Sequence, residues 1–318
     1  LLRYLKKIFY NSVAELRYIK NGWCPDNAGK TVEWAFQDWG LSRMALRLGK
    51  KSDAEVFEKR SHCWTSLFNV EHGLLFPKTQ TGKWSHTDPL NGQGWVEANS
   101  WQATWSVSHD LPRLVSLMGG GDKFCEKLNY AFEQARPTDF VHAYSGGYVS
   151  YANQPGCSNA HLFTYGGKPW LTQYWVRQVK RYAYDGVTPD KGYGGHDEDE
   201  GQMGGVSALM ALGIFSVTGT ESDIPYYDIT SPIFDKISIT LNPDYYPGKE
   251  FVINVHNNSE QNCYIQKAVL NGNEWQYAQF DHKDFAQGGS LELWLGDTPN
   301  KDWGKLKYFS YDNMKSDN

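Results

Sequence analysis

The chain has 318 residues, of which 40% are hydrophobic and 21% are charged, as in ordinary globular proteins. Its formal net charge of -5 argues against a nucleic-acid or anionic-membrane partner. No apolar run is long enough for a transmembrane segment, and the five cysteines lack the spacing of a zinc site.

Helical periodicity dominates the sequence up to about residue 220. The run "TVEWAFQDWGLSRMALRLG" spaces apolar residues along one helix face, and Gly49 can cap its end. The next run, "SDAEVFEKRSHCWTSLF", begins with Ser52 and Glu55 at capping-box spacing. We expect about eight helical segments, one of them over residues 100–120. Helix pairs joined by long Gly- and Trp-rich loops suggest an α/α toroid.

After residue 225 the pattern changes to short strands. "DKISITLNP" and "EFVINVHNN" alternate apolar and polar residues, and "GGSLELWLG" closes the set. Asn271-Gly272 is a strong hairpin-turn signal. Short, evenly spaced strands predict a small β-sandwich. The expected fold is mainly α with β, with a helical domain over residues 1–224 and a small β-sandwich domain over residues 225–318.

Glu97 lies between Trp95 and Trp101 in "GQGWVEANSWQATW", directly before an expected helix. Two indoles near a carboxyl lower the local polarity, which favours the protonated form that a general acid needs. The alternative is an exposed glutamate that the helix dipole stabilises.

The stretch "YVSYANQPGCSNAHLF" holds a turn at Asn153, Gln154, Pro155 and Gly156. Its side-chain and backbone carbonyl oxygens are plausible ligands of a hard cation. The alternative is a plain loop before a helix.

Four consecutive acids lie between glycines in "YGGHDEDEGQMGG", residues 193–205. In an extended loop Asp197 and Asp199 point to the same side, so both can reach one water or one cation. Glu198 and Glu200 would then point elsewhere. A solvated loop tip is the alternative.

At these three loops the sequence resembles glycoside hydrolase family 92, the calcium-dependent inverting exo-α-mannosidases. The family's "EGNAWQYTWFVPHDV…LMGG" is similar to "EANSWQATWSVSHDLPRLVSLMGG" here, and its "GDEDNGQ" is similar to "GHDEDEGQ". Its "NEP" or "NQP" turn is similar to Asn153-Gln154-Pro155. The resemblance runs from about Gly22 to Gly304. It implies the C-terminal part of an (α/α)6 catalytic barrel followed by the β domain.

The resemblance also implies residue roles. Glu97 matches the family's general acid, and Asp197 and Asp199 match the candidates for the general base. The turn matches the calcium and mannose site, with Asn153, Gln154 and Asp197 as expected Ca²⁺ ligands. The remaining expected sugar-binding residues are Trp95, Trp101 and His196, beside Asn153 and Gln154.

Two departures from the family pattern affect these expectations. Ala98 replaces the glycine of "EGN", and Gln154 replaces a common glutamate, which removes one negative charge beside the cation. The resemblance further implies that an N-terminal β-sandwich and earlier barrel helices complete the site. We therefore expect this chain to be the C-terminal piece of a longer protein that is secreted, periplasmic or on the cell surface.

The expected reaction is hydrolysis of a terminal non-reducing α-mannoside with inversion, on α-1,2-type linkages of mannan or N-glycan. The partner is then a mannose-containing glycan. Two alternatives stay open. One is another α/α-toroid enzyme, such as a phosphorylase or a lyase, and the other is a non-catalytic sugar-binding relic.

Overall fold

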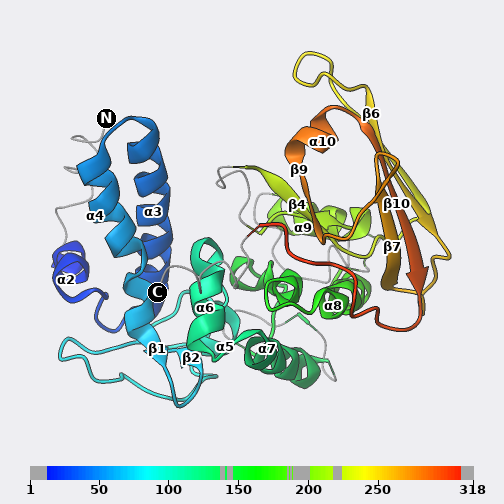
Figure 1. Ribbon diagram of the computed structural model, residues 1–318. Coiled ribbons are helices and arrows are strands. Elements are labelled where there is room, and N and C mark those ends of the chain that lie inside the picture. The colour runs from blue at the N-terminus through cyan, green and yellow to red at the C-terminus, as the bar shows by residue number, and fades with distance from the viewer. Residues whose placement is uncertain are drawn as a thin grey trace. The chain divides into compact units, whose positions relative to one another are not determined.

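The computed structural model describes residues 13–136, 140–141, 146–184, 186, 188, 201–217 and 224–308. These residues form both helices and sheets, so the fold is mixed α and β (Figure 1). The chain divides into two compact units. Unit 1 is Leu1–Asp110 with His142–Ser150, and unit 2 is Leu111–Val141 with Tyr151–Asn318.

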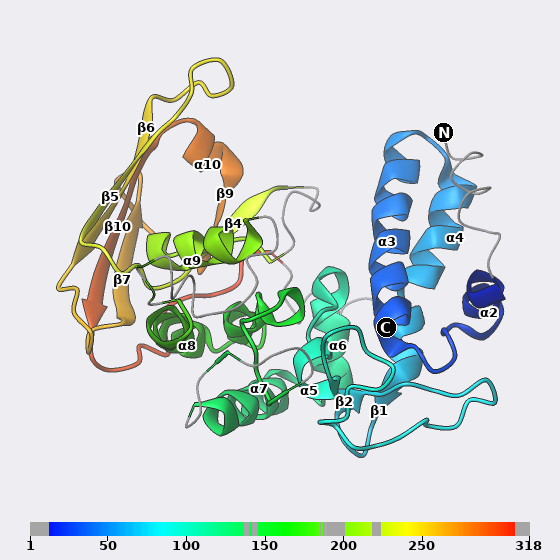
Figure 2. The same ribbon diagram turned by 180° about the vertical axis from the view of Figure 1, so that it is seen from behind.

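Unit 1 is built around a pair of packed helices, α3 and α4, which lie side by side in Figure 2. One face of α3 is buried, through residues such as Val32, Ala35 and Trp39. The elements of unit 1 are α2 (Val13–Asn21), α3 (Ala28–Arg47), α4 (Lys51–Ser61), η1 (Cys63–Leu67), β1 (Phe68–Asn69), β2 (Leu74–Leu75), α5 (Ser100–Ala103) and η2 (Ser108–Asp110).

The end of α3 confirms the predicted role of Gly49 and corrects the predicted start of α4. Gly49 has a φ of 69° and donates to the carbonyl of Leu46 at 3.0 Å, while Lys50 donates to that of Ala45 at 2.8 Å. This pair of bonds is a Schellman motif. Because the motif turns the chain so tightly, α4 begins at Lys51 with Lys50 as N-cap, and no side chain caps it. The capping box predicted at Ser52 was wrong.

The single helix predicted over residues 100–120 is interrupted. It is replaced by α5, η2 and α6 (Leu111–Leu117). Near the break, the Trp105 indole donates to the carbonyl of Trp101 at 2.7 Å, and the Thr104 hydroxyl donates to that of Ser100 at 2.6 Å. Side chains that bond nearby carbonyls compete with helical bonds, so the turn at Ser100–Ala103 stops after four residues.

Unit 2 has a helical part whose core is aromatic. Phe132, Phe140, Phe163 and Trp175 are fully buried, and the rings of Phe132 and Trp175 lie 5.0 Å apart between centroids. The elements are α6, α7 (Gly121–Ala135), η3 (Gln154–Gly156), η4 (Asn159–Thr164), α8 (Pro169–Tyr182) and α9 (Gln202–Leu212).

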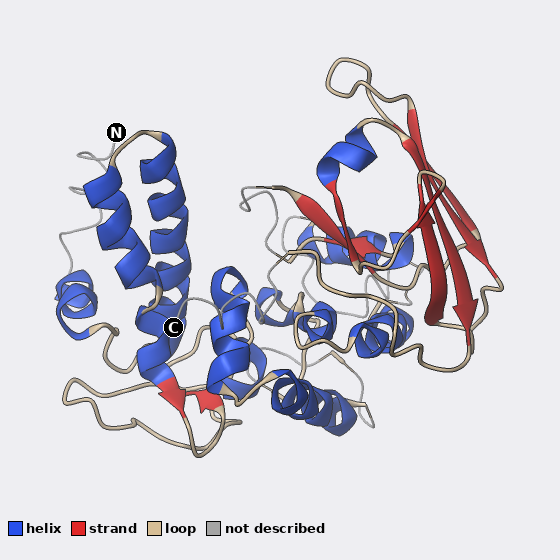
Figure 3. Cartoon of the chain, in the orientation of Figure 1, coloured by secondary structure: helices blue, strands red, loops and turns tan. Residues whose placement is uncertain are grey.

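The strands of unit 2 form two sheets, drawn in red in Figure 3. The five-stranded sheet has the order β5-β6-β10-β7-β8, with β6 and β10 parallel and the other pairs antiparallel. Its strands are β5 (Lys236–Thr240), β6 (Glu250–His256), β7 (Tyr264–Leu270), β8 (Asn273–Glu274) and β10 (Gly289–Gly296). The three-stranded sheet comprises β3 (Ile214–Phe215), β4 (Tyr226–Ile229) and β9 (Gln279–Asp281), and α10 (His282–Ala286) follows β9.

The two sheets share one hydrophobic core, because the rings of Phe251 on β6 and Phe280 on β9 stack at 5.7 Å. The hairpin predicted at Asn271-Gly272 is confirmed. Both residues have positive φ, 50° and 79°, and they join β7 to β8. Unit 2 holds both the helices α6 to α9 and the sheets, so the domain boundary predicted between residues 224 and 225 stays a prediction.

Candidate active site

The predicted site residues fall in three parts of the chain. Trp95, Glu97 and Trp101 lie in unit 1, and Asn153 and Gln154 lie in unit 2. The acidic run lies outside the residues that the structure describes. Its predicted site residues are His196, Asp197 and Asp199, accompanied by Glu198 and Glu200. Convergence of the three loops on one cleft therefore stays a prediction.

Glu97 is an exposed side chain between the buried residues Trp95 and Ala98, and its neighbour Val96 is exposed as well. The φ of Glu97 is 51°, in the left-handed region that side chains other than glycine seldom adopt. The next residue, Ala98, is only 1% exposed and is not among the residues with positive φ. Alanine is therefore tolerated where the family pattern has glycine. Strained backbone of this kind clusters at functional sites.

Hydrogen bonds fix the chain on both sides of Glu97. The Trp95 indole donates to the Ser100 hydroxyl at 3.2 Å. Asn99 is the N-cap of α5, accepting from the Gln102 amide at 3.1 Å and donating to the Gly147 carbonyl at 2.9 Å. Asn99 is fully buried, so these bonds are shielded from water. These hydrogen bonds thus fix the backbone on both sides of the exposed Glu97 carboxylate.

The two tryptophans beside Glu97 are mostly buried, with 9% of Trp95 and 7% of Trp101 exposed. The Trp101 ring lies 5.3 Å from that of Tyr148, in the returning segment of unit 1. Both indoles therefore support the loop from inside. Their predicted contact with a sugar stays a prediction.

The Asn153 turn in unit 2 is a short 3-10 helix with a side-chain cap. Asn153 is buried, and its side-chain oxygen accepts from the Gln154 amide at 2.9 Å, while the Gln154 side chain is exposed. The Cys157 thiol reaches the carbonyl of Asn153 at 3.6 Å. Two amide side chains, one buried and one exposed, are thus presented at a single fixed turn.

The start of α9 lies beside this turn. The Cys157 sulfur is 3.9 Å from the Met203 sulfur, and the Tyr184 hydroxyl is 3.7 Å from the same atom. Tyr184 also donates to the carbonyl of Tyr151 at 3.1 Å. Met203 is the second residue of α9, and in the sequence the acidic run ends two residues before α9 begins. The Asn153 turn is thus in contact with α9, the helix that follows the acidic run in the sequence.

The calcium prediction agrees in donor type with the residues described at the turn. Asn153 and Gln154 offer amide oxygens, which hard cations prefer. Across the described ranges, no three His, Cys, Asp or Glu side chains gather as a metal site. The carboxylate assigned to calcium, that of Asp197, is outside those ranges.

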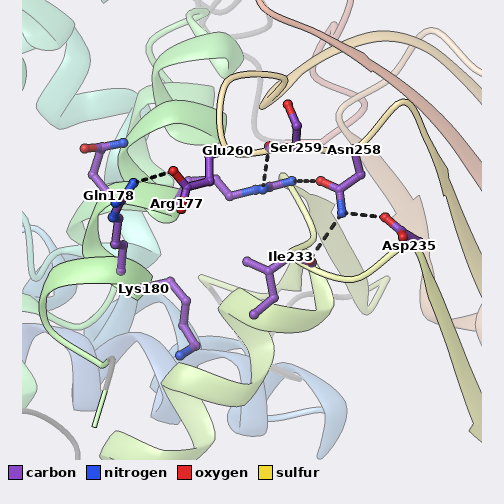
Figure 4. A pocket seen from close by; sticks show the side chains of 9 residues that line it. Arg177, Gln178, Lys180, Ile233, Asp235, Asn258, Ser259 and Glu260 are labelled. Atoms are coloured by element: carbon purple, nitrogen blue, oxygen red, sulfur yellow. Dashed lines mark hydrogen bonds and ion pairs between the residues drawn. The ribbon is translucent and has the colours of Figure 1, made fainter.

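An open cleft of about 580 Å³ lies elsewhere in unit 2, between α8 and the loops around the sheets (Figure 4). Arg177 dominates it, donating to the Ser259 carbonyl at 3.2 Å and to the Asn258 side chain at 2.6 Å. Arg181 pairs with Glu260 at 3.0 Å. The lining groups thus bond largely to one another, and none of the predicted site residues within the described ranges contributes to the cleft. We interpret it as a structural junction.

Sequence reasoning did not single out His161. Its ring is fully buried, stacks on Phe215 at 3.7 Å, and has no hydrogen-bond partner for either nitrogen among the described residues. Burial lowers the pKa of His161 to about 3, so its imidazole is neutral at ordinary pH. Its only signal in the sequence is the histidine within "NAHLF", five residues after the turn ends at Gly156.

Glycoside hydrolases use a pair of carboxyl groups beside the scissile bond, and Glu97 offers one exposed carboxyl group. Within the described residues, no helix is long and apolar enough to cross a membrane. The chain matches the family model described as "Glycosyl hydrolase family 92 catalytic domain" over residues 6–297, and it belongs to that family.

Solved structures of other members of this family are similar to this chain. The structure of the family GH92 inverting mannosidase BT2199 from Bacteroides thetaiotaomicron is 31% identical, with a TM-score of 0.79 over 94% of this chain and 42% of that chain. The family GH92 α-mannosidase BT3965 from the same species is 23% identical, with a TM-score of 0.80 over 95% of this chain and 40% of that one, which supports the fold alone.

A curated relative from Arthroderma benhamiae, named "Uncharacterized secreted glycosidase", is 28% identical over 94% of this chain and 39% of that protein. The chain thus spans about two fifths of the length of the relatives it matches.

Proposed function

We propose that this chain is part of a glycoside hydrolase that releases terminal non-reducing α-mannose with inversion, from α-1,2-type linkages of mannan or N-glycan. The observation that carries the proposal is Glu97, an exposed carboxylate at a φ of 51° on a loop that hydrogen bonds hold on both sides. Family membership and the similarity to an inverting mannosidase support it.

In the proposed reaction Glu97 protonates the oxygen of the departing group. Asp197 or Asp199 deprotonates a water on the opposite face of the sugar. In an inverting enzyme the acid and base carboxyls lie about 6.5–9.5 Å apart, which leaves room for that water. The proposal thus requires the acidic run and the Glu97 loop to face one another across the substrate.

The proposed mannose site combines the Asn153 turn with Trp95, Trp101 and His196. A calcium ion held by Asn153, Gln154 and Asp197 would supply a positive charge to sugar hydroxyls. The contact of Met203 with Cys157 supports this grouping, because it holds the start of α9 beside the turn.

The proposed architecture is the C-terminal part of an (α/α)6 barrel, followed by a small β-sandwich. A further β-sandwich and earlier barrel helices from the rest of the protein would complete the site. A secreted, periplasmic or cell-surface location is proposed, and the name of the Arthroderma benhamiae relative supports secretion.

The test is mannose release by the full-length protein from a panel of α-mannosides, with NMR detection of the first anomer formed. Initial release of β-mannose that stops in excess chelator and returns with calcium is the expected result. Initial α-mannose would contradict inversion. Mannose release that depends on phosphate would indicate a phosphorylase, and an unsaturated sugar product would indicate a lyase. Binding of the glycan without release of mannose would indicate a non-catalytic relic.

A further inference from the structure

We propose that Gly29, in the first turn of α3, is a positioning residue that sets the direction of the Glu97 carboxylate. The inference rests on the proposed role of Glu97 as general acid. All the contacts involved lie within unit 1.

The first turn of α3 holds the Glu97 loop by a backbone hydrogen bond. The first amides of a helix have no partner inside the helix. Here Asn27 caps the Lys30 amide at 2.9 Å, and the Gly29 amide donates to the carbonyl of Gly94 at 3.1 Å. Gly94 lies three residues before Glu97, so the helix end fixes the start of the loop that carries the acid.

Gly29 also permits the loop to rest directly on the helix. A Cβ atom at residue 29 would lie 3.3 Å from the backbone nitrogen of Val96 and 3.7 Å from the Cα of Trp95. Of these two contacts only the one with the Val96 nitrogen is tight, and because that atom belongs to the backbone, it can give way only if the loop shifts by a few tenths of an ångström. Val96 is the residue directly before Glu97, and a shift there is transmitted to the acid.

Gly94, at the start of the loop, is closely packed as well. Gly94 has a φ of 85°, and a Cβ there would meet the Cβ of Pro77 at 2.7 Å and the carbonyl of Asp26 at 3.2 Å. Asp26 itself has a φ of 56° and accepts a 2.6 Å hydrogen bond from Ser85. The loop that carries Glu97 is therefore in close contact with both α3 and the segment around Pro77.

The test compares Gly29→Ala with Gly40→Ala in the full-length protein. Gly40 lies in the same helix, and a Cβ there meets nothing within 4 Å, so this variant is a matched control. Each is assayed on an alkyl mannoside, which needs protonation to leave, and on a nitrophenyl mannoside, which does not. Melting temperatures verify that both variants are folded.

Gly29→Ala should lower kcat on the alkyl mannoside by roughly tenfold, with a much smaller loss on the nitrophenyl substrate and little change in KM, because proton transfer depends steeply on geometry. Gly40→Ala should have the same kcat and KM as the unmodified protein on both substrates. Equal losses on both substrates, or no loss at all, would overturn the inference.

A double variant separates this inference from the proposed function. If Gly29 acts through Glu97, then Gly29→Ala should add no further loss in a Glu97→Gln background. Additive losses would reject the positioning role. If Glu97→Gln alone shows no dependence on the leaving group, the proposed acid has failed. If it does show the dependence and Gly29→Ala does not, only the inference about Gly29 has failed.

Discussion

Among the site residues that the structure describes, Glu97 and Gln154 are exposed, and each is held at a fixed backbone position. Glu97 takes a left-handed conformation after the buried Trp95, and Gln154 follows the buried cap residue Asn153. The fold thus presents one carboxylate and one neutral amide to solvent, each close to a buried residue, Ala98 beside Glu97 and Asn153 beside Gln154.

Replacing Glu97 with glutamine keeps the shape of the side chain but removes the proton. The rate on an alkyl mannoside should fall by roughly 10²–10⁴, because an alkoxide leaves poorly without protonation. The loss on a nitrophenyl mannoside should be much smaller. Parallel kcat/KM measurements give the ratio of the two losses.

Variants of the proposed general base give a second ratio of losses on the two substrates, with which the ratio for Glu97→Gln is compared. Asp197→Asn or Asp199→Asn, whichever removes the base, should impair both substrates alike, because water must be activated whatever group departs. The same ratio for Glu97→Gln and the base variant would remove Glu97 from the role of general acid.

Gln154→Glu should tighten calcium binding. The exposed side chain would gain a full negative charge, and a charge about 4 Å from a divalent cation gains roughly 2 kcal/mol even at the dielectric constant of water. We expect an increase in affinity of about thirtyfold, the equivalent of roughly 2 kcal/mol, measured by calorimetric titration of the calcium-free full-length protein. Gln80→Glu, at an exposed position in unit 1, controls for the change in net charge. Unchanged or weaker binding by Gln154→Glu would count against calcium at this turn.

At the scale of elements, the α3–α4 pair depends on one glycine. Gly49 ends α3 in the left-handed conformation, which lets the chain reverse within a few residues and pack α4 against α3. Beyond that turn, burial of the apolar faces and the ion pairs of Asp38 with Arg60 and of Arg43 with Glu58 stabilise the helix pair.

Gly49→Ala should destabilise the protein by about 1–2 kcal/mol, because alanine resists a left-handed φ. A Cβ at residue 49 meets nothing within 4 Å, so the cost is purely that of the backbone. Gly40→Ala, inside α3, should instead stabilise by about 0.5–1 kcal/mol. Denaturant unfolding of both variants measures the free energies. Changes of the same sign would refute this account of the α3 terminus.

At the scale of the whole molecule, polar contacts in unit 2 join the helical part to the sheets. Asp228 on β4 is fully buried, and it accepts from the Tyr165 hydroxyl and the Gln279 amide, each at 3.0 Å. The side-chain oxygen of Gln279 accepts from the backbone amides of Lys307 and Tyr308, at 3.0 and 2.8 Å. One buried carboxyl therefore connects η4, two strands and the segment after β10.

Burial raises the pKa of Asp228 to about 7, from about 3.9 in the unfolded chain. The folded state thus holds this proton more tightly than the unfolded state does. The contribution of Asp228 to stability is fully present below about pH 4 and is lost as the pH rises toward 7. Asp228→Asn mimics the protonated form and should abolish this loss.

The measurement is the free energy of unfolding of both proteins between pH 4 and pH 8. Titrating groups other than Asp228 are common to both and cancel in the difference. The difference should grow with pH in favour of the variant. Curves that stay parallel would show that Asp228 does not titrate in this window.

Local signals in the sequence determined the features that short stretches of chain settle alone. Gly49 and Asn271-Gly272 specified their turns because few residues tolerate positive φ, and strand alternation specified the sheets because one face of each strand is buried. The motif around Glu97 likewise identified the family. The capping box at Ser52 and the continuous helix over residues 100–120 were wrong, because the Schellman turn and the bonds of Thr104 and Trp105 took over the backbone there.

Tertiary structure decided the rest. Nothing local in "DNAGK" shows that Gly29 must lie against Val96, and nothing in "YYDIT" shows that Asp228 is buried beneath Tyr165, 63 residues away in sequence. Contact between Met203 and Cys157 is equally invisible in the sequence. Periodicity and turn chemistry act within a few residues, whereas close approach and burial depend on which distant segments meet. The sequence could therefore name the candidate acid, but only the fold could show what holds it in place.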